Sequence, residues 1–388
     1  MDQLPFERGD DPLVAAEHYR TVQDRSAVAP VRTMAGDAAW LVTRYADVKA
    51  LLSDERLGRS HPRPEQAARI SPSALLGGAA GDHENEERQH QRLRRLLAPA
   101  FSARRMGQLQ TRIGELVDGL LDEMRTPPAD LHLAVSVPLP VMVICELLGV
   151  PYGEDDRLRT WSTDLASLDA DRSQAALRDF TGYLHTLIEH KRGNPGDDVI
   201  SDLVRAEAAM TDTDVARVAA TLLFAGHETT TVRIDLGTLL LISHPDQYRA
   251  LRADPRLIDS AVDEVLRMST FSSIGGLPRY ANTDLSIDDV TVAAGDAVLL
   301  SIAAANRDLR AFAEPDTFDI TRTPNKHLAF GHGPRYCIGA SLARVELCEV
   351  LRRIVDRFPR LDLAVPREEL RTHRKSLTGG LVSLPVTW

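Results

Sequence analysis

The sequence predicts a mainly α-helical protein, a single large helical domain with small peripheral β-sheets. Helical spacing of apolar residues dominates the chain, whereas β-like runs are short and gather near 31–43, 277–301 and 376–388. Strands and helices do not alternate in the way that builds a parallel sheet. The 388 residues exceed the roughly 250–300 at which one simple core stops growing. This leaves two domains or one multilayer domain, and we expect one domain over residues 1–388.

The first half of the chain contains one predicted strand and one long predicted loop. The strand, 39–43, is a short apolar run after Gly36 and Asp37. The stretch 59–81 is rich in Pro and Gly, and loops of this length are usually lids or binding loops. We expect a lid because no shift in composition follows; a disordered linker is the alternative. Helical spacing covers 12–26, 47–52, 88–97, 106–124, 139–148 and 173–191.

The longest predicted helix runs from 211 to 243 and would span roughly 45 Å, enough to cross the molecule. Apolar residues lie on most of its faces, so we expect it to be buried. Further helices are predicted at 257–268 and 338–358. The runs 290–292 and 297–300 flank an Ala-Gly-Asp turn, which predicts a hairpin.

Charge and cysteine content exclude several classes of protein. Lys and Arg number 46 and Asp and Glu 56, so the net charge is −10, which disfavours a nucleic-acid-binding surface. Three cysteines cannot build a disulfide framework in so long a chain, which indicates a reducing compartment. No run of about 18 apolar residues could span a bilayer, and the N-terminus lacks a secretory signal. We expect a cytoplasmic protein with no nucleic-acid or membrane partner.

Several catalytic motifs fail at a defining position. Gly331 and Gly333 begin a dinucleotide fingerprint, but Tyr336 stands where its third glycine belongs. His227 begins a zinc-protease motif, but Thr231 replaces the second histidine. No serine lies in a nucleophile elbow, and no cysteine pair has zinc spacing. Common hydrolase and NAD-enzyme templates therefore do not fit.

Cys337 lies between a Gly- and Pro-rich loop, 330–336, and the start of a predicted helix. The free N–H groups and partial positive charge of a helix N-terminus favour thiolate over thiol. The glycines allow the backbone to approach a flat or bulky group. Cys145 and Cys348 lie within apolar helical patterns and are interpreted as small buried hydrophobes, an interpretation that Cys337 alone would also allow.

Three further groups of residues narrow the possible functions of the chain. Within the long helix, residues 225–230 (Ala-Gly-His-Glu-Thr-Thr) place an acid and hydroxyls where burial is costly. Hydroxyls bonded to i−4 carbonyls would open the helix for water or dioxygen, and a plain kink or an exposed face is the alternative. Glu264 and Arg267 share a helix face, as an ordinary surface pair would. His90 and Arg94 lie on one helix face and could bind two carboxylates; a solvated basic face is the alternative.

In this order, the four clusters resemble a cytochrome P-450 of the soluble bacterial type, and the resemblance covers essentially the whole chain. Residues 330–339 match the haem-ligand pattern F-x-x-G-x-R-x-C-x-G at every fixed position. Residues 225–230 match the oxygen-groove motif, and Glu264 with Arg267 matches the structural E-x-x-R pair. The resemblance implies a haem-thiolate monooxygenase that uses haem b (iron protoporphyrin IX), dioxygen and electrons from NAD(P)H.

The resemblance also implies roles for individual residues. Cys337 would be the axial thiolate, which favours O–O cleavage. Gly226, Glu228 and Thr229 would handle dioxygen and its protons. Other cofactor contacts would come from His90, Arg94, Ala225, Thr230, Arg279, Phe330, Gly331, Gly333, Arg335, Ile338 and Gly339. The substrate pocket, roofed by the predicted lid, would be lined by Leu222, Ala225, Phe271, Ser272, Ile274, Gly275 and Leu277.

The chain departs from the family pattern at Thr317, where an arginine or histidine is usual. This puts the third partner of Glu264 and Arg267 in doubt, and Arg322 is the candidate substitute.

No reductase domain is attached, so we expect electrons to come from a separate ferredoxin and ferredoxin reductase. We also expect a monomer. A basic dock for an acidic ferredoxin would use Arg92, Arg95, Arg104, Arg105 and Arg344, although scattered surface arginines would give the same pattern.

By the same resemblance the substrate would be an apolar or natural-product-like small molecule, with a role in secondary metabolite biosynthesis. Two other functions stay open. Oxidative C–C or C–N coupling without oxygen insertion would use the same residues as hydroxylation. A non-catalytic haem-binding sensor is disfavoured by Glu228 and Thr229, since a sensor needs no proton relay.

Overall fold

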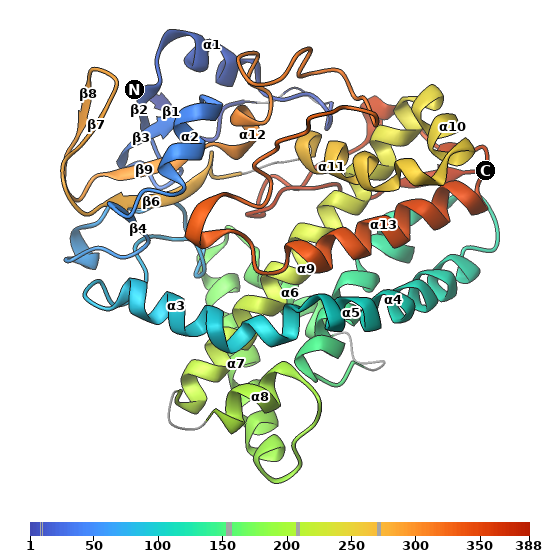
Figure 1. Ribbon diagram of the computed structural model, residues 1–388, viewed down its shortest axis with the longest axis horizontal. Helices are drawn as coiled ribbons and strands as arrows, with labels where there is room; N and C mark the ends of the chain where they lie inside the picture. Colours follow the sequence, from blue (N-terminus) through green and yellow to red (C-terminus); the bar gives the residue numbers. More distant parts are fainter. Residues whose placement is uncertain (8, 10, 153–156, 207–209, 270–272) are drawn as a thin grey trace.

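The computed structural model describes residues 1–388 apart from 8, 10, 153–156, 207–209 and 270–272. Its central element is α9 (Asp212–Ser243), a 32-residue helix that runs diagonally through the molecule (Figure 1). Thr211 and Asp214 cap its start by bonding each other's backbone N–H groups. Buried residues lie on most faces of its second half, so the predicted long, buried helix is confirmed.

Helices pack against α9 from several sides, and each predicted helical segment overlaps one observed helix. The helices in contact with α9 are α5, α6, α7, α8, α10, α11 and α13. The short helices α6, α8, α10 and α12 lie outside the predicted segments, because few turns give too little periodicity to detect. No helix in the described part of the chain is both long and apolar enough to cross a bilayer. The bounds are α1 (Glu17–Arg25), α2 (Tyr45–Leu51), α3 (Glu86–Leu97), α4 (Ala103–Glu123), α5 (Pro138–Leu148), α6 (Arg157–Leu165), α7 (Ala170–Gly193), α8 (Val199–Arg205), α10 (Pro245–Ala253), α11 (Ile258–Met268), α12 (Ile302–Ala305) and α13 (Ala340–Arg357).

The main sheet lies to one side of the helices, on the left in Figure 1. Its strand order is β1-β2-β3-β9-β6-β4, with β3 and β9 parallel. A smaller sheet of order β10-β11-β5 carries the C-terminus, and β7 pairs with β8. The bounds are β1 (Asp2–Gln3), β2 (Val28–Arg32), β3 (Ala38–Val42), β4 (Leu57–Gly58), β5 (Ala129–Asp130), β6 (Leu277–Ala281), β7 (Leu285–Ile287), β8 (Val290–Val292), β9 (Ala297–Leu300), β10 (Asp362–Leu363) and β11 (Pro385–Thr387).

The predicted hairpin between 290–292 and 297–300 is wrong. Strand β8 instead pairs with β7 across a two-residue turn in which Asp288 takes a φ of 50°. Strand β9 is buried along its whole length and pairs with β3 and β6. A fully apolar strand needs neighbours on both sides, and this requirement outweighs the local turn signal.

The stretch 59–81 is a loop, as predicted, with one short 3₁₀ turn at Pro64–Gln66. It closes on itself, because the backbone N–H of Ala80 donates to the carbonyl of Arg59 at 3.0 Å. A second internal bond runs from the N–H of Ile70 to the carbonyl of Gly77 at 2.9 Å, and Ile70 is fully buried. The loop is therefore folded onto the protein.

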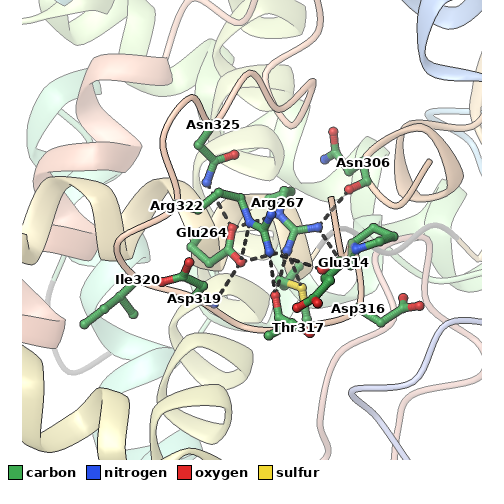
Figure 2. Close-up of polar contacts among 12 residues, drawn as sticks. Glu264, Arg267, Asn306, Glu314, Asp316, Thr317, Asp319, Ile320, Arg322 and Asn325 are labelled. Carbon is green, nitrogen blue, oxygen red and sulfur yellow. Dashed lines mark hydrogen bonds and ion pairs between the residues drawn. The ribbon is translucent and has the colours of Figure 1, made fainter. Parts of the chain in front are cut away.

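The buried pair Glu264–Arg267 clamps α11 to the segment that precedes the Cys337 loop (Figure 2). Both nitrogens Nε and Nη2 of Arg267 lie 2.7 Å from the carboxylate of Glu264, and both side chains are fully buried. The guanidinium also donates to the carbonyls of Asn306, Pro315 and Thr317. A buried guanidinium is stable only when its donors find acceptors, and here loop carbonyls supply them.

Arg322 is the third charged partner, as the sequence suggested. Its Nε lies 3.1 Å from Oε1 of Glu264, and its Nη2 donates to the carbonyl of Thr317 at 3.0 Å. Glu264 also accepts from the side-chain amide of Asn325 and the backbone N–H of Asp319, each at 3.0 Å (Figure 2). Thr317 thus contributes through its main chain, and its side chain does not replace a cation.

Arg322→Ala should lower the free energy of unfolding by about 2–3 kcal/mol, because it removes a charged hydrogen bond to a buried carboxylate. Urea unfolding of the purified holoprotein measures the loss. Thr317→Ala is the matched control: it keeps the carbonyl that both arginines use and should change stability by less than about 0.5 kcal/mol. Equal losses in the two variants would contradict the role of Arg322.

Candidate functional site

A cavity of about 340 Å³ lies between the middle of α9 and the loop that precedes α13. Cys337 and Thr229 both line it, so the structure brings the predicted metal ligand and the predicted oxygen-handling hydroxyl to one space. Leu76, from the loop 59–81, also lines it. The predicted residues on its walls are Leu222, Ala225, Gly226, Thr229, Thr230, Ile274, Leu277, Phe330, Cys337, Ile338 and Gly339.

Three predicted pocket residues do not appear on these walls. Phe271 and Ser272 lie outside the described residues. Gly275 packs against Leu4, away from the cavity, and its neighbour Gly276 takes the place at the wall.

The Cys337 loop is held by its own backbone. The N–H of Cys337 donates to the carbonyl of Phe330 at 2.9 Å. Gly331 and Gly333 have φ values of 74° and 73°, a region that favours glycine. Nη1 of Arg94 donates to the carbonyl of Tyr336 at 2.6 Å and ties the loop to α3. The predicted glycines therefore shape the loop that presents the sulfur.

The surroundings of Cys337 act on its pKa in both directions. Burial raises the pKa of Cys337, although the N–H of Gly339 and the charges of Arg94, Arg233 and Arg344 act to lower it. The helix α13 begins only at Ala340, so the expected effect of a helix start is weak here. A coordinated metal deprotonates a thiol outright, and ligation would therefore supply the thiolate.

The 225–230 segment is an uninterrupted part of α9, so the expected local opening of the helix is not observed. Oγ1 of Thr229 donates to the carbonyl of Ala225 at 2.7 Å, which confirms the predicted i−4 bond without breaking the helix. A Cβ on Gly226 would lie 2.9 Å from Ile144 of α5, so the glycine permits close helix packing.

Glu228 is linked to the cavity through a residue that the sequence did not indicate. Oγ1 of Thr378 donates to its Oε2 at 3.2 Å, and Thr378 lines the cavity. Burial raises the pKa of Glu228 to about 7, although the Thr378 hydrogen bond and the charge of His132 act to lower it. Glu228 can therefore hold or release a proton near neutral pH. Residues 150 positions apart leave no local pattern from which this contact could be predicted.

Basic side chains lie close together around the start of α3. They include the predicted His90, Arg94, Arg279 and Arg335, and also Arg59, which was not predicted. Burial, with the charges of Arg59 and Arg335, lowers the pKa of Arg279 to about 10. Burial and the charge of Arg335 also lower the pKa values of Arg59 and His90. Two carboxylates lie among them: Glu86 accepts from Nη2 of Arg335 at 2.7 Å and from the N–H of Arg59 at 2.9 Å, and Glu87 accepts from the same Nη2 at 3.4 Å. Positive charge exceeds negative charge in this cluster.

This cluster fits the propionates of a haem. Nδ1 of His90 is buried without a hydrogen-bond partner in the part of the chain that the structure describes. Two further carboxylates would neutralise the surplus cations and satisfy that atom. Within the same described part, no group of three or more His, Cys, Asp or Glu side chains could hold a bare metal ion. A lone Cys337 ligand therefore suits an iron whose other ligands come from a macrocycle.

Comparison with known proteins gives a family match. The family model for cytochrome P-450 matches residues 165–383. The chain is 42% identical to pentalenolactone synthase of Streptomyces exfoliatus over 405 aligned residues, which cover 100% of both chains. It is 40% identical to mycinamicin IV hydroxylase/epoxidase of Micromonospora griseorubida, over 97% of this chain and 96% of that one.

Solved structures give the same result. The cytochrome P-450 hydroxylase from the leinamycin biosynthetic pathway of Streptomyces atroolivaceus superposes with a TM-score of 0.90 at 38% identity, and the match covers 100% of both chains.

Arg94→Ala should accelerate haem loss to apomyoglobin by roughly 10–100-fold, because one charge-assisted contact is removed from the propionate cluster. The carbon monoxide difference spectrum of the remaining holoprotein should stay thiolate-like, because Cys337 is unchanged. Arg92→Ala is the control, since Arg92 is exposed on the same helix. It should retain haem normally and affect, at most, reduction by ferredoxin. Equal haem loss in both variants would show that α3 is merely destabilised.

Proposed function

The chain belongs to the cytochrome P-450 family, and on that premise we propose that it is a haem-thiolate monooxygenase acting on an apolar, natural-product-like small molecule. The observation that carries the proposal is that Cys337 and Thr229 line one mostly apolar cavity. A metal ligand and a proton-handling hydroxyl on facing walls are what oxygen activation beside an organic substrate requires.

Haem b would be held by Cys337 at the iron and by the cations around α3 at the propionates. Those cations are Arg94, Arg279 and Arg335 together with Arg59, and His90 would add a hydrogen bond. When bound, haem supplies dioxygen activation, and its thiolate ligand favours O–O cleavage. Phe330, Ile338 and Gly339 lie on the cavity wall beside Cys337 and would pack against the macrocycle.

Glu228 and Thr229 would deliver protons. Glu228 keeps its proton below about pH 7 and passes it toward the cavity through Thr378, which contacts its carboxylate. Thr229 Oγ1 is fixed by the Ala225 carbonyl, so its position at the cavity wall does not depend on a flexible partner.

The substrate would be selected by apolar walls. Leu222, Ile274 and Leu277 line the cavity as predicted, and Leu76 brings the loop 59–81 to the same wall, which supports a lid role for that loop. The names of the relatives refer to pentalenolactone, mycinamicin and leinamycin. We place the substrate of this chain in the same broad class of secondary metabolites.

Electrons would come from NAD(P)H through a ferredoxin reductase and an acidic ferredoxin that binds near α3. Arg105 and Arg344 of the predicted dock are engaged by Asp197 and Asp263. The exposed Arg95 and Arg104 are the stronger candidates for contact with ferredoxin.

A substrate screen read by the haem spin-state shift, followed by the product mass, tests the proposed function. A product that gains one oxygen atom per turnover supports monooxygenation. A product that loses two hydrogens, gains no oxygen and carries a new C–C or C–N bond would instead establish oxidative coupling. Ligand binding without NAD(P)H-dependent product, with competent redox partners present, would favour a sensor.

Thr229→Ala should keep haem and substrate binding but divert reduced oxygen to peroxide, because a proton-relay hydroxyl matters only after dioxygen binds. Product formed per NAD(P)H consumed measures the loss. Coupling in the native protein should also fall as pH rises through about 7, because Glu228 then loses its proton.

Thr221→Ala is the matched control for Thr229→Ala. Thr221 makes the same i−4 bond on α9, to the carbonyl of Arg217, but it is exposed to solvent. Its replacement should leave coupling unchanged. An unaltered ratio of product to NAD(P)H consumed in Thr229→Ala would contradict the role proposed for that hydroxyl.

A further inference from the structure

Arg233 of α9 lies on the cavity wall and has no role in the reaction proposed above. It follows Thr229 by one helical turn, and its Nη1 donates to the carbonyl of Thr229 at 3.3 Å. The guanidinium is therefore folded back along α9, toward the residue that carries the oxygen-handling hydroxyl. Both residues line the cavity that contains Cys337.

No carboxylate neutralises Arg233 in the part of the chain that the structure describes. Its hydrogen bond there goes to a main-chain carbonyl, which leaves Nε and Nη2 without an acceptor among those residues. Burial lowers its pKa to about 10, so the guanidinium stays charged at neutral pH. Cys337 acts in the opposite direction, but ligation to iron would neutralise the charge of its sulfur. A buried cation is unfavourable without an anion, so the free Nε–Nη2 edge indicates an acceptor from outside the chain.

Glu346 is the acidic side chain on the same wall, and it is not the partner of Arg233. It is 2% exposed, and its Oε2 has no hydrogen-bond partner within the described residues. Burial raises the pKa of Glu346 well above its ordinary value, which favours the neutral acid. Apart from Glu346, Arg233 and Cys337, the described residues on the wall cannot carry a charge near neutral pH. The anion for Arg233 must therefore enter the cavity with a ligand.

The haem propionates have a different site. They fit the basic cluster around the start of α3, and no member of that cluster is among the described residues on the cavity wall. Arg233 is thus separate from the residues that would hold the cofactor's carboxylates. The ligand that best supplies its anion is the substrate.

The cavity has a charged end and an apolar end along α9. Residues 222 and 233 are eleven positions apart, or roughly 16 Å along the helix axis, and both line the cavity. Leu222 is aliphatic, and Thr229 lies between the two. A molecule with a carboxylate at one end and a hydrocarbon body would satisfy both ends.

We propose that Arg233 binds a carboxylate of the substrate, so that the enzyme acts on an organic acid with an apolar body. The inference rests on the proposed function and names the class of its substrate. The two oxygens of a carboxylate match the Nε and Nη2 donors as a pair, which a neutral amide or ester cannot do. Because Arg233 is one turn from Thr229, the ion pair would also fix which part of the substrate lies beside that hydroxyl.

Ligand binding to the ferric holoprotein tests the inference without turnover. The probes are 1-adamantanecarboxylic acid and decanoic acid, each compared by calorimetry with its primary amide, which has similar size and no charge. Each acid should bind on the order of 10- to 100-fold more tightly than its amide. Arg233→Met should abolish this preference, and Arg233→Lys should retain part of it, because lysine keeps the charge without the paired geometry. Equal affinities of acids and amides, or no binding of either acid, would overturn the proposal.

Arg217→Met is the matched control, since Arg217 is an exposed arginine on the same helix. It loses the same charge and should keep the preference for acids. Glu346→Gln should also keep it; a gain in acid affinity there would show that Glu346 is the partner of Arg233 and would overturn the proposal. Haem loss to apomyoglobin should be unchanged in Arg233→Met. Acceleration like that expected for Arg94→Ala would make Arg233 a propionate ligand instead.

Turnover separates this inference from the proposed function. If amides are oxygenated as efficiently as the matched acids, the acid specificity fails and the monooxygenase stands. If acids bind selectively through Arg233 but no oxygenated product forms with competent redox partners, the monooxygenase fails and the carboxylate site stands.

Discussion

A polar side chain on a helix that is buried through the middle of a protein is stabilised when it finds a partner inside, and several polar side chains of α9 do so. The hydroxyl of Thr229 donates a hydrogen bond to the backbone of the same helix. The side chains of three other residues find partners on other segments: His227 with Ser162, Glu228 with Thr378 and Asp235 with His132. These partners fix where the surrounding segments pack. The chemistry of the site and the packing of the fold are thus set by the same few hydrogen bonds.

Charge is distributed unevenly in a chain whose net charge is −10. Around the start of α3 the arginines outnumber the carboxylates of Glu86 and Glu87, and burial makes their mutual repulsion unfavourable. Two further carboxylates would reduce this repulsion, so binding of the proposed cofactor would stabilise this region. By contrast, Glu264 and Arg267 are fully satisfied by protein groups and need no guest.

The sequence predicted well what is local and less well what depends on tertiary contacts. The loop 330–339 and the helix segment 225–230 follow from motif and spacing, and both line the cavity as expected. The prediction of a hairpin at 290–300 was wrong because the burial of β9 determined which strands pair with β9. Arg59 and Thr378 were missed because each is an ordinary residue in a loop until the fold brings it to the site.

The loop 59–81 contributes residues to two different parts of the site. Arg59, at its base, belongs to the cluster that would retain the cofactor, whereas Leu76 reaches the wall against which a substrate would lie. The bond from Ala80 to Arg59 fixes the base whatever the intervening residues are. Mutations near Leu76 can therefore accumulate under selection for new molecules while haem retention is preserved, which makes this loop a natural place for paralogues to diverge.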